Sequence, residues 1–420
     1  MSFASAYIKK NILFSQFIDD KPETDTGIIV VIPSYGESNI NSVTDSLAAA
    51  DKPDCNVEVI ITVNAPQNAP QWSIEKNKDT LSDIEYRRRN DKNLWFRLFS
   101  LDIKQGTIPD WGVGLARKTG MDEALRRFNA IDNKHGIIAC LDADCKVEKN
   151  YFSAINDQFV KQKKLNACSI YFEHDIRGSE FPEPAYKNIL QYELHLRYLI
   201  QGLKFSGCPW AFHTVGSSMA VRANQYALQG GMNRRQAGED FYFIQKMISA
   251  GGYFSLSSTT VYPSSRTSFR VPFGTGAAME KLCSESDSQF MTYSPAAFEE
   301  LRKLFLMAES LYGCSETELI NSYYNLPEGI KLYLKKEEWT LKIIEIKGNT
   351  SNVQAFRKRF YNWFNMFRIV RYLNTVHAGL LAKMPVIDAA TVFLQNLPNG
   401  YNGNSSEDLL IYYRKLEKGN

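Results

Sequence analysis

The sequence predicts an α/β protein with a mostly parallel β-sheet flanked by helices, followed by a helical C-terminal appendage. Two observations predict this fold class. In the first half of the chain, apolar runs of strand length alternate with helix-length segments, an order typical of βαβ units with parallel strands. Strand signals then vanish from Ala277 onward. Because 420 residues exceed one ordinary domain, we expect a lead-in over 1–26, a sheet domain over 27–280 and a helical region over 281–420.

The strands are predicted from runs of apolar and β-branched residues. The first run, Gly27–Pro33, is expected to end at Pro33, because proline cannot donate a hydrogen bond to a neighbouring strand. Another run, from Gly136 to Leu141, is followed at once by charged residues, which marks the end of burial. The other expected strands are Val57–Val63, Leu94–Leu101, Leu165–Phe172, Gly216–Arg222 and Tyr253–Tyr262.

Helix-length segments separate these runs. One helix is expected from Phe241 to Ala250, with a stop at Gly251 and Gly252, since glycine favours helix ends. Residues 67–92 are polar and predict only a mixture of loop and helix. The other expected helices are 39–50, 112–128, 150–161, 183–203 and most of 299–416.

Composition narrows the class of protein. A net charge of +3 on so long a chain gives no support for a nucleic-acid partner. The seven cysteines are scattered and lack metal-ligand spacing, which favours a reducing compartment. The first residues do not resemble a signal peptide, and no segment has the apolar length that spanning a bilayer needs. We therefore expect a cytoplasmic protein, held at most peripherally on the inner face of a membrane.

Two aspartates follow the expected strand at 136–141. Asp142 and Asp144 are two residues apart, so on an extended backbone their side chains point the same way, at the edge where α/β sheets bind ligands. Carboxylate oxygens suit Mg²⁺ or Mn²⁺, which usually also bind phosphate oxygens. The alternative is an acidic surface turn, since aspartate is common in turns. The preceding buried strand favours the functional interpretation.

Three further polar clusters lie at the ends of expected elements. Pro33, Tyr35 and Glu37 follow the first strand, and Asn64 follows the second. Glu239 and Asp240 stand at the start of a helix, where carboxylates also serve as simple helix caps.

The order and spacing of these four clusters resemble family 2 of the GT-A glycosyltransferases, inverting enzymes that take a sugar from a nucleoside diphosphate. The resemblance covers Ile28 to Gly276 and implies a Rossmann-like nucleotide-diphospho-sugar transferase fold. It further implies nucleotide binding by Pro33, Tyr35, Glu37, Asn64 and Asp142, a divalent metal on Asp144 and Asp142, and Asp240 as the base beside Glu239. The family normally has an aspartate where this chain has Asn64, so a UDP-sugar and a GDP-sugar both remain candidate donors.

Elementary chemistry supports the same roles. Displacing a diphosphate requires positive charge near the leaving group, which a divalent ion and guanidinium groups supply. It also requires a carboxylate to accept the proton of the attacking hydroxyl. Asp240 at a helix N-terminus is expected to be stabilised as an anion by the helix dipole.

Basic residues near these clusters are candidates for contacts with the diphosphate or the acceptor. Arg266 and Arg270 lie four apart in a hydroxyl-rich loop and suit an anionic ligand, although surface salt bridges are equally common. Arg117 and Lys118 open a helix and could reach a phosphate, or they could be solvated charges.

Two further candidates precede the expected strand at 216–222. Trp210 and His213 stand where the resembled family often places acceptor contacts. An aromatic face suits a sugar ring, but a buried tryptophan is the more frequent finding.

The segment 356–373 combines an aromatic stripe with basic residues and no acids. Such a helix could lie on an anionic membrane, where lipid-linked acceptors are found. Packing of the stripe against neighbouring helices is the interpretation that we favour.

Three functions are weighed on these observations. The leading one is a metal-dependent inverting glycosyltransferase with a saccharide or lipid-linked acceptor, in bacterial polysaccharide or lipopolysaccharide synthesis. A haloacid-dehalogenase-type phosphatase also uses Asp-x-Asp, but on its first strand, whereas here the motif follows the fourth. A non-catalytic nucleotide- or glycan-binding module would lack the base, and Asp240 is present.

Overall fold

The computed structural model describes residues 2–104, 111–235, 238–266, 289–397 and 405–419, together with Leu282, Tyr401 and Gly403. The chain divides into two compact units. The first, the sheet unit, consists of Met1–Tyr186 and Thr214–Glu280, and the second, the helical unit, of Lys187–His213 and Lys281–Asn420. The helical unit thus includes residues 187–213, which the predicted boundary assigned to the sheet domain.

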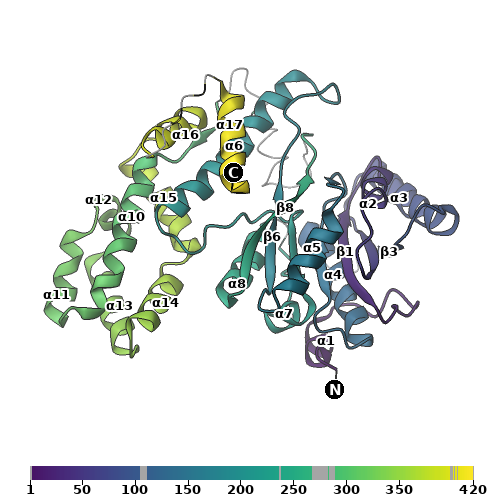
Figure 1. Cartoon of the computed structure of the whole chain (residues 1–420), viewed down its shortest axis with the longest axis horizontal. Coiled ribbons are helices and arrows are strands. Elements are labelled where there is room, and N and C mark those ends of the chain that lie inside the picture. The colour runs from purple at the N-terminus through teal and green to yellow at the C-terminus, as the bar shows by residue number, and fades with distance from the viewer. Residues whose placement is uncertain are drawn as a thin grey trace. The chain divides into compact units, whose positions relative to one another are not determined.

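A mixed β-sheet forms the core of the sheet unit (Figure 1). Its strand order is β3-β2-β1-β4-β7-β6-β8-β5. The first four are parallel, as the βαβ pattern predicts, whereas β7 runs antiparallel to both β4 and β6. The strands are β1 (Thr26–Ser34), β2 (Asn56–Val63), β3 (Arg97–Asp102), β4 (Ile137–Cys140), β5 (Lys146–Val147), β6 (Ala167–Phe172), β7 (Met219–Arg222) and β8 (Tyr253–Tyr262).

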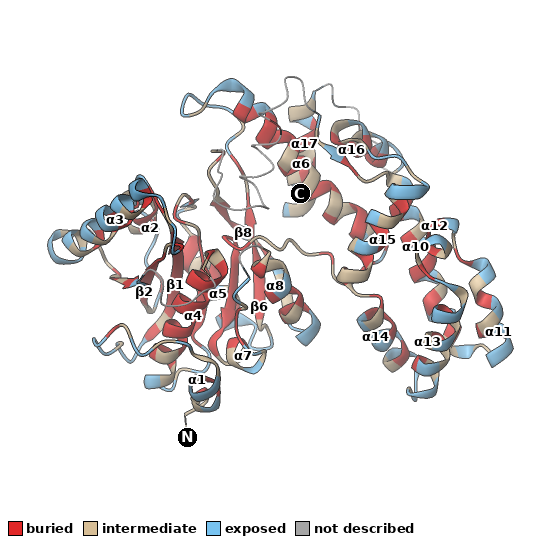
Figure 2. Ribbon diagram, turned by 180° about the vertical axis from the view of Figure 1, so that it is seen from behind, coloured by how far each residue is buried: buried red, intermediate tan, exposed pale blue. Residues whose placement is uncertain are grey.

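Helices cover this sheet and leave its central strands almost free of solvent, as the red strands of Figure 2 show. Helix α4 packs against β1 and β2, α3 against β3, and α5 against β8. The helices of the sheet unit are α1 (Ser5–Asn11), α2 (Asn41–Ala48), α3 (Gln71–Asn90), α4 (Val113–Ala130), α5 (Tyr151–Lys161), α7 (Ala223–Leu228) and α8 (Glu239–Ala250). Helix α6 (Glu183–Phe205) begins in this unit and continues into the helical one.

Two predicted boundaries differ from the structure. Strand β1 continues through Pro33 to Ser34, where it is still paired with β2. Its pairing with β4 already ends at Val31, so the missing N–H of Pro33 interrupts no pairing on that side. The expected mixture of loop and helix at 67–92 is mostly the single helix α3. Its buried residues are largely polar, among them Ser73, Asn77 and Thr80, so it lacks the apolar period by which helices are predicted.

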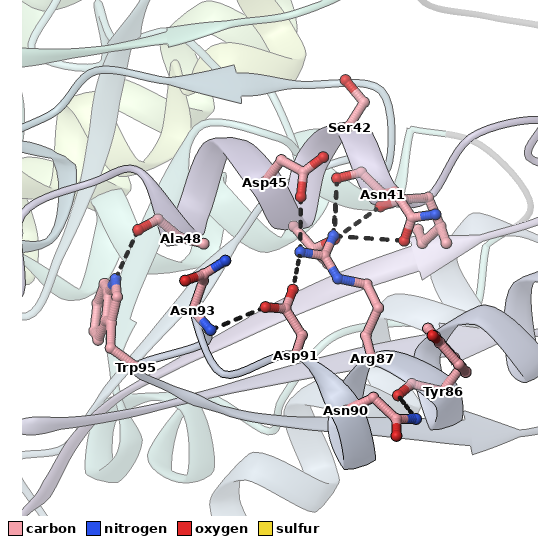
Figure 3. A network of polar contacts seen from close by, with 12 residues as sticks. Asn41, Ser42, Asp45, Ala48, Tyr86, Arg87, Asn90, Asp91, Asn93 and Trp95 are labelled. Atoms are coloured by element: carbon pink, nitrogen blue, oxygen red, sulfur yellow. Dashed lines mark hydrogen bonds and ion pairs between the residues drawn. The ribbon is translucent and has the colours of Figure 1, made fainter.

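An arginine fixes α3 to α2 (Figure 3). The Arg87 guanidinium pairs with Asp45 of α2 at 2.7 Å and with Asp91 at 2.8 Å, and it donates to the Asn41 carbonyl oxygen at 3.3 Å. Nearby, the Trp95 indole donates to the Ala48 carbonyl oxygen at 2.9 Å. Helix α2 follows β1 and helix α3 follows β2, so these contacts hold together the segments that follow two neighbouring strands.

The helical unit contains short packed helices and a two-stranded sheet of β9 (Met291–Thr292) and β10 (Met384–Pro385). Within the residues described, no helix is both long and apolar enough to span a bilayer. Besides α6, the helical elements are α10 (Pro295–Ser310), η1 (Leu311–Gly313), α11 (Glu316–Asn321), η2 (Ser322–Asn325), α12 (Glu328–Tyr333), α13 (Lys336–Gly348), α14 (Val353–Trp363), α15 (Met366–Gly379), α16 (Val386–Gln395) and α17 (Ser406–Lys418).

The segment 356–373 is two helices rather than one. Helix α14 ends at Trp363, and the Asn365 side chain caps α15 by accepting from the backbone N–H groups of Phe367 and Arg368 at 3.1 and 3.3 Å. Phe356 and Phe360 are fully buried inside the helical unit. The aromatic stripe therefore packs against neighbouring helices, while peripheral membrane contact through 356–373 stays a prediction.

Candidate functional site

The predicted polar clusters of the sheet unit come from separate stretches of the chain and meet in two ion-pair networks. Asp142 and Asp144 follow β4, Glu37 follows β1, and Glu239 and Asp240 form the first turn of α8. Parallel strands bring their carboxyl ends to one edge of a sheet, and β1 is paired with β4 in the register Val31 to Cys140. Two arginines join the carboxylates there, and each defines one network.

The first network surrounds Arg117, which is 2% exposed on α4. Its guanidinium contacts Asp142 at 2.7 Å and also donates to the Glu239 carboxylate. A Cβ on Gly216 would lie 2.8 Å from the same guanidinium, so only glycine lets this backbone approach. Arg117 therefore holds Asp142 and Glu239 together in the interior of the site. The sequence had suggested instead that it could contact a phosphate of the ligand.

Asp240 is held by backbone donors beside this network. The N–H groups of Gly216 and Phe241 donate to its two carboxylate oxygens at 3.0 and 2.7 Å. Burial raises the pKa of Asp240, although Arg117 and the Phe241 hydrogen bond oppose the rise. The helix N-terminus was expected to stabilise the anion, but burial outweighs that effect.

Glu239 has a raised pKa for a related reason. Burial raises the pKa of Glu239 to about 7, with Arg117 acting against the rise and the negative charge of Asp240 adding to it. A carboxyl pair with pKa values above the ordinary range and next to a cation is typical of acid–base sites. Glu239 can therefore exchange a proton near neutral pH.

The second network surrounds Arg266, which follows β8. Its two terminal nitrogens donate to the two oxygens of Glu37, each at 2.9 Å, in a bidentate arrangement. Its Nε pairs with Asp144 Oδ2 at 2.7 Å. One guanidinium thus links Glu37, which was predicted to bind the nucleotide, to Asp144, which was predicted to bind the metal.

A third set of contacts orders the turn after β1. Asn77 of α3 accepts a hydrogen bond from the Gly36 N–H at 2.8 Å and donates to the Asn64 carbonyl oxygen at 3.1 Å. The Asn64 side chain donates in turn to the Gly112 carbonyl oxygen at 3.0 Å. Asn77 thereby fixes the ends of β1 and β2 relative to each other. Sequence reasoning missed it, because an asparagine inside a polar helix gives no signal of its partners.

Aromatic rings lie close to this turn. The rings of Tyr35 and Trp111 have centroids 5.6 Å apart at a tilted angle, and both residues are partly exposed. Trp72, 54% exposed, has its ring 2.9 Å from where a Cβ of Gly36 would be. Such rings offer flat apolar surface for a nucleobase. Of these, only Tyr35 was predicted.

Comparisons with known proteins complete this description. No protein-family model and no curated protein matches the sequence. Among solved structures, S. aureus TarS 1-349 in complex with UDP-GlcNAc is 14% identical, with a TM-score of 0.41 over 85% of this chain and 93% of that chain. The mannosyltransferase PcManGT from Pyrobaculum calidifontis in complex with GDP-Man and Mn²⁺ is also 14% identical, with a TM-score of 0.36 over 93% and 92%. At these values, an assignment of function has to come from the site itself.

Three of the remaining candidates have partners of their own that belong to neither network. Lys118 turns away from Arg117 and pairs with Asp122 at 2.8 Å in a buried group with Tyr7, which does not favour a phosphate contact. Trp210 and His213 belong to the helical unit, where Trp210 donates to the Tyr361 carbonyl oxygen and His213 pairs with Glu417 at 2.9 Å. Arg270 lies outside the described residues.

The residues present fit a divalent cation that arrives with a diphosphate. Asp142 and Asp144 offer carboxylate oxygens, and their side chains are 41% and 26% exposed. Among the residues described, no group of three His, Cys, Asp or Glu side chains is placed to hold a metal. Mg²⁺ and Mn²⁺ need only one or two carboxylates when phosphate oxygens complete the coordination, so this pair is sufficient.

Proposed function

We propose that this protein is a glycosyltransferase of the GT-A type, family 2, that moves a sugar from a nucleoside-diphosphate donor to an acceptor hydroxyl with inversion. The observation that carries the proposal is the meeting of four carboxylates from three separate segments in the two networks of Arg117 and Arg266. Such a group of carboxylates can bind a phosphate-bound cation and a ribose and can also supply a catalytic base.

The reaction needs a proton acceptor on the acceptor side of the sugar. In the proposed step the acceptor oxygen forms a bond to the anomeric carbon, the bond from that carbon to the diphosphate oxygen breaks, and the hydroxyl proton passes to Asp240. The two N–H groups on Asp240 fix its carboxylate in orientation. Glu239 and Arg117 set the charge around it.

The leaving diphosphate needs positive charge in the transition state. A divalent ion on Asp144 and Asp142, Mn²⁺ or Mg²⁺, would supply part of that charge when bound. Arg266 reaches the same region and its fork suits phosphate oxygens. The nucleoside would lie over Pro33, Tyr35 and Asn64, with Glu37 on the ribose.

The acceptor side is proposed on chemical grounds alone. A saccharide or lipid-linked saccharide of bacterial polysaccharide or lipopolysaccharide synthesis would supply the hydroxyl. A cytoplasmic location, peripheral on the inner membrane face, is part of this proposal.

Thermal stability in the presence of nucleotides tests the donor site. We expect one of UDP, GDP or their sugar conjugates to raise Tm with Mn²⁺ or Mg²⁺, because a ligand of the folded state stabilises it by mass action. The rise should disappear with chelator and in Asp144→Ala, and transfer should be lost in both Asp144→Ala and Asp240→Ala. Asp157→Ala is a suitable control, since Asp157 is an exposed aspartate paired with Lys161.

Two results would count against the proposal. If no nucleotide changes Tm, release of phosphate from phosphomonoesters becomes the next assay, because the phosphatase also uses Asp-x-Asp. If nucleotides bind but Asp240→Ala retains full transfer, the assigned base is wrong.

A further inference from the structure

A single guanidinium engages both the predicted metal carboxylate and the predicted ribose carboxylate. Arg266 contacts Glu37 through two 2.9 Å hydrogen bonds and Asp144 through a 2.7 Å ion pair. The three side chains are 24%, 8% and 26% exposed, so the group is largely shielded from water. Ion pairs that are shielded in this way are stronger than pairs on an open surface.

The contact with Asp144 opposes the binding of a metal at the same carboxylate. A Mg²⁺ or Mn²⁺ ion lies about 2.0–2.2 Å from a carboxylate oxygen and carries two positive charges. Arg266 Nε is already 2.7 Å from Asp144 Oδ2. Two cations beside one carboxylate repel each other, so the guanidinium weakens metal binding for as long as it stays on Asp144.

We propose that Arg266 is an internal cation that competes with the divalent metal for Asp144 and keeps the site closed until the donor arrives. The inference rests on the proposed function for the identity of the donor, but the competition itself concerns Asp144 and metal alone. Arg266 is in this sense a positioning residue, which sets how tightly the free protein holds metal.

Donor binding would replace the cation on Asp144 and the anions on Arg266. The metal replaces the guanidinium as the cation on Asp144, and the diphosphate replaces Glu37 and Asp144 as the anion on Arg266. A guanidinium fork binds phosphate as well as carboxylate, so the exchange keeps its hydrogen bonds. Glu37 becomes available to a ribose hydroxyl in the same step. The consequence is that metal alone binds weakly, and metal with donor binds well.

The test is Mn²⁺ binding to the purified protein without nucleotide, measured from the EPR signal of free Mn²⁺ and by calorimetry. In Arg266→Gln, we expect Mn²⁺ to bind about tenfold more tightly or better, a change that corresponds to about 1.4 kcal/mol. Arg266→Lys should lie between the two proteins, because an ammonium keeps the charge but cannot span both carboxylates. The matched control is Arg97→Gln, which removes an arginine paired with Glu58 and Asp20.

A double variant assigns the site. The gain in Mn²⁺ affinity should be absent from Arg266→Gln/Asp144→Asn, and thermal melts should show that each variant is folded. Equal Mn²⁺ affinity in wild type and both Arg266 variants, or a gain that survives in the double variant, would overturn the inference. Because no nucleotide is present, the result does not depend on whether the protein is a glycosyltransferase.

Discussion

At the residue scale, the role that we propose for Asp240 comes with a cost in stability. Desolvation by the surrounding protein raises the pKa of its carboxyl, the negative charge of Asp142 adds to the rise, and Arg117 offsets only part of it. A carboxyl with a higher pKa in the folded chain than in the unfolded chain binds more protons when folded. Stability then falls as pH rises through the window between the two pKa values.

This sign gives the first prediction. Asp240→Asn should lower transfer by a factor of about 10²–10⁴, as expected for loss of a general base. Its Tm relative to wild type should increase between about pH 4, near the ordinary pKa of an aspartate, and pH 8, because only the wild type has to ionise this desolvated group. Scanning fluorimetry at both pH values, with the transfer assay, measures both effects. A Tm difference that is constant with pH would show that Asp240 ionises freely.

Several site residues could be predicted at this scale because a strand end and a short motif mark them, as for Asp142 and Asp144. Their partners could not. The sequence offers no sign that Arg117 pairs inward with Glu239, or that Arg266 joins Glu37 to Asp144, since both pairings depend on how distant segments meet. Asn77 was missed for the same reason.

At the element scale, the fit of α4 on the sheet depends on one glycine. A Cβ on Gly120 would lie 2.4 Å from Val31 Cγ1 and 2.7 Å from Thr62 Oγ1. Both neighbours are β-branched residues of central strands and have little freedom to move. Close approach of α4 therefore places Arg117, one turn earlier, at the polar edge.

The second prediction follows from this packing. Gly120→Ala should destabilise the protein by about 1–3 kcal/mol, because overpacking outweighs the better helix propensity of alanine. The control is Gly348→Ala in α13, where nothing lies within 4 Å of the added carbon, and there we expect no loss. Urea denaturation of both variants compares them, and equal stability would show that α4 can shift at no cost.

The elements were predicted best where burial is apolar. Strand β8 begins and ends at the predicted residues, Tyr253 and Tyr262, and the alternation of β1, β2 and β4 with helices gave the parallel half of the sheet. Helix α3 is long but was predicted only in part, because its buried face is polar. The break between α14 and α15 was also missed, since the Asn365 cap interrupts an otherwise continuous aromatic stripe.

At the scale of the whole molecule, a buried charge network joins the two ends of the helical unit. Arg197 of α6 is fully buried and pairs with Glu193 at 2.8 Å and with Glu417 of α17. Arg414 contacts Glu193 at 2.7 Å. Burial alone would raise the pKa of Glu417, but His213 and Arg197 lower it below its usual value.

The third prediction concerns this network. Glu417→Ala should destabilise the helical unit by about 3–5 kcal/mol, because it leaves a buried guanidinium short of one partner. Hydrogen exchange followed by mass spectrometry should show faster exchange in α6 and α17, with the strands β1 and β4 unchanged. Uniform acceleration over the entire chain, or none, would contradict a local role.

The division of the chain was predicted only in outline. The loss of strand signals near Ala277 marks where the helical residues begin, but no compositional change marks 187–213 as part of the helical unit. A long amphipathic helix has the same apolar periodicity whichever hydrophobic core it packs into. The periodicity of α6 therefore could not show to which unit it belongs.

The discontinuous sheet unit has a consequence for biosynthesis. Strands β7 and β8 leave the ribosome after α6, and the aromatic partners of Tyr198 in α6, which are Phe298 of α10 and Phe393 of α16, come later still. During that interval the apolar face of α6 is not yet covered by the later helices of the helical unit. Exposed apolar surface of this kind is what chaperones bind. A fragment of residues 27–280 would never contain the later helices that cover α6. Poor solubility of that fragment would therefore reflect the uncovered face of α6 rather than a defect in the sheet.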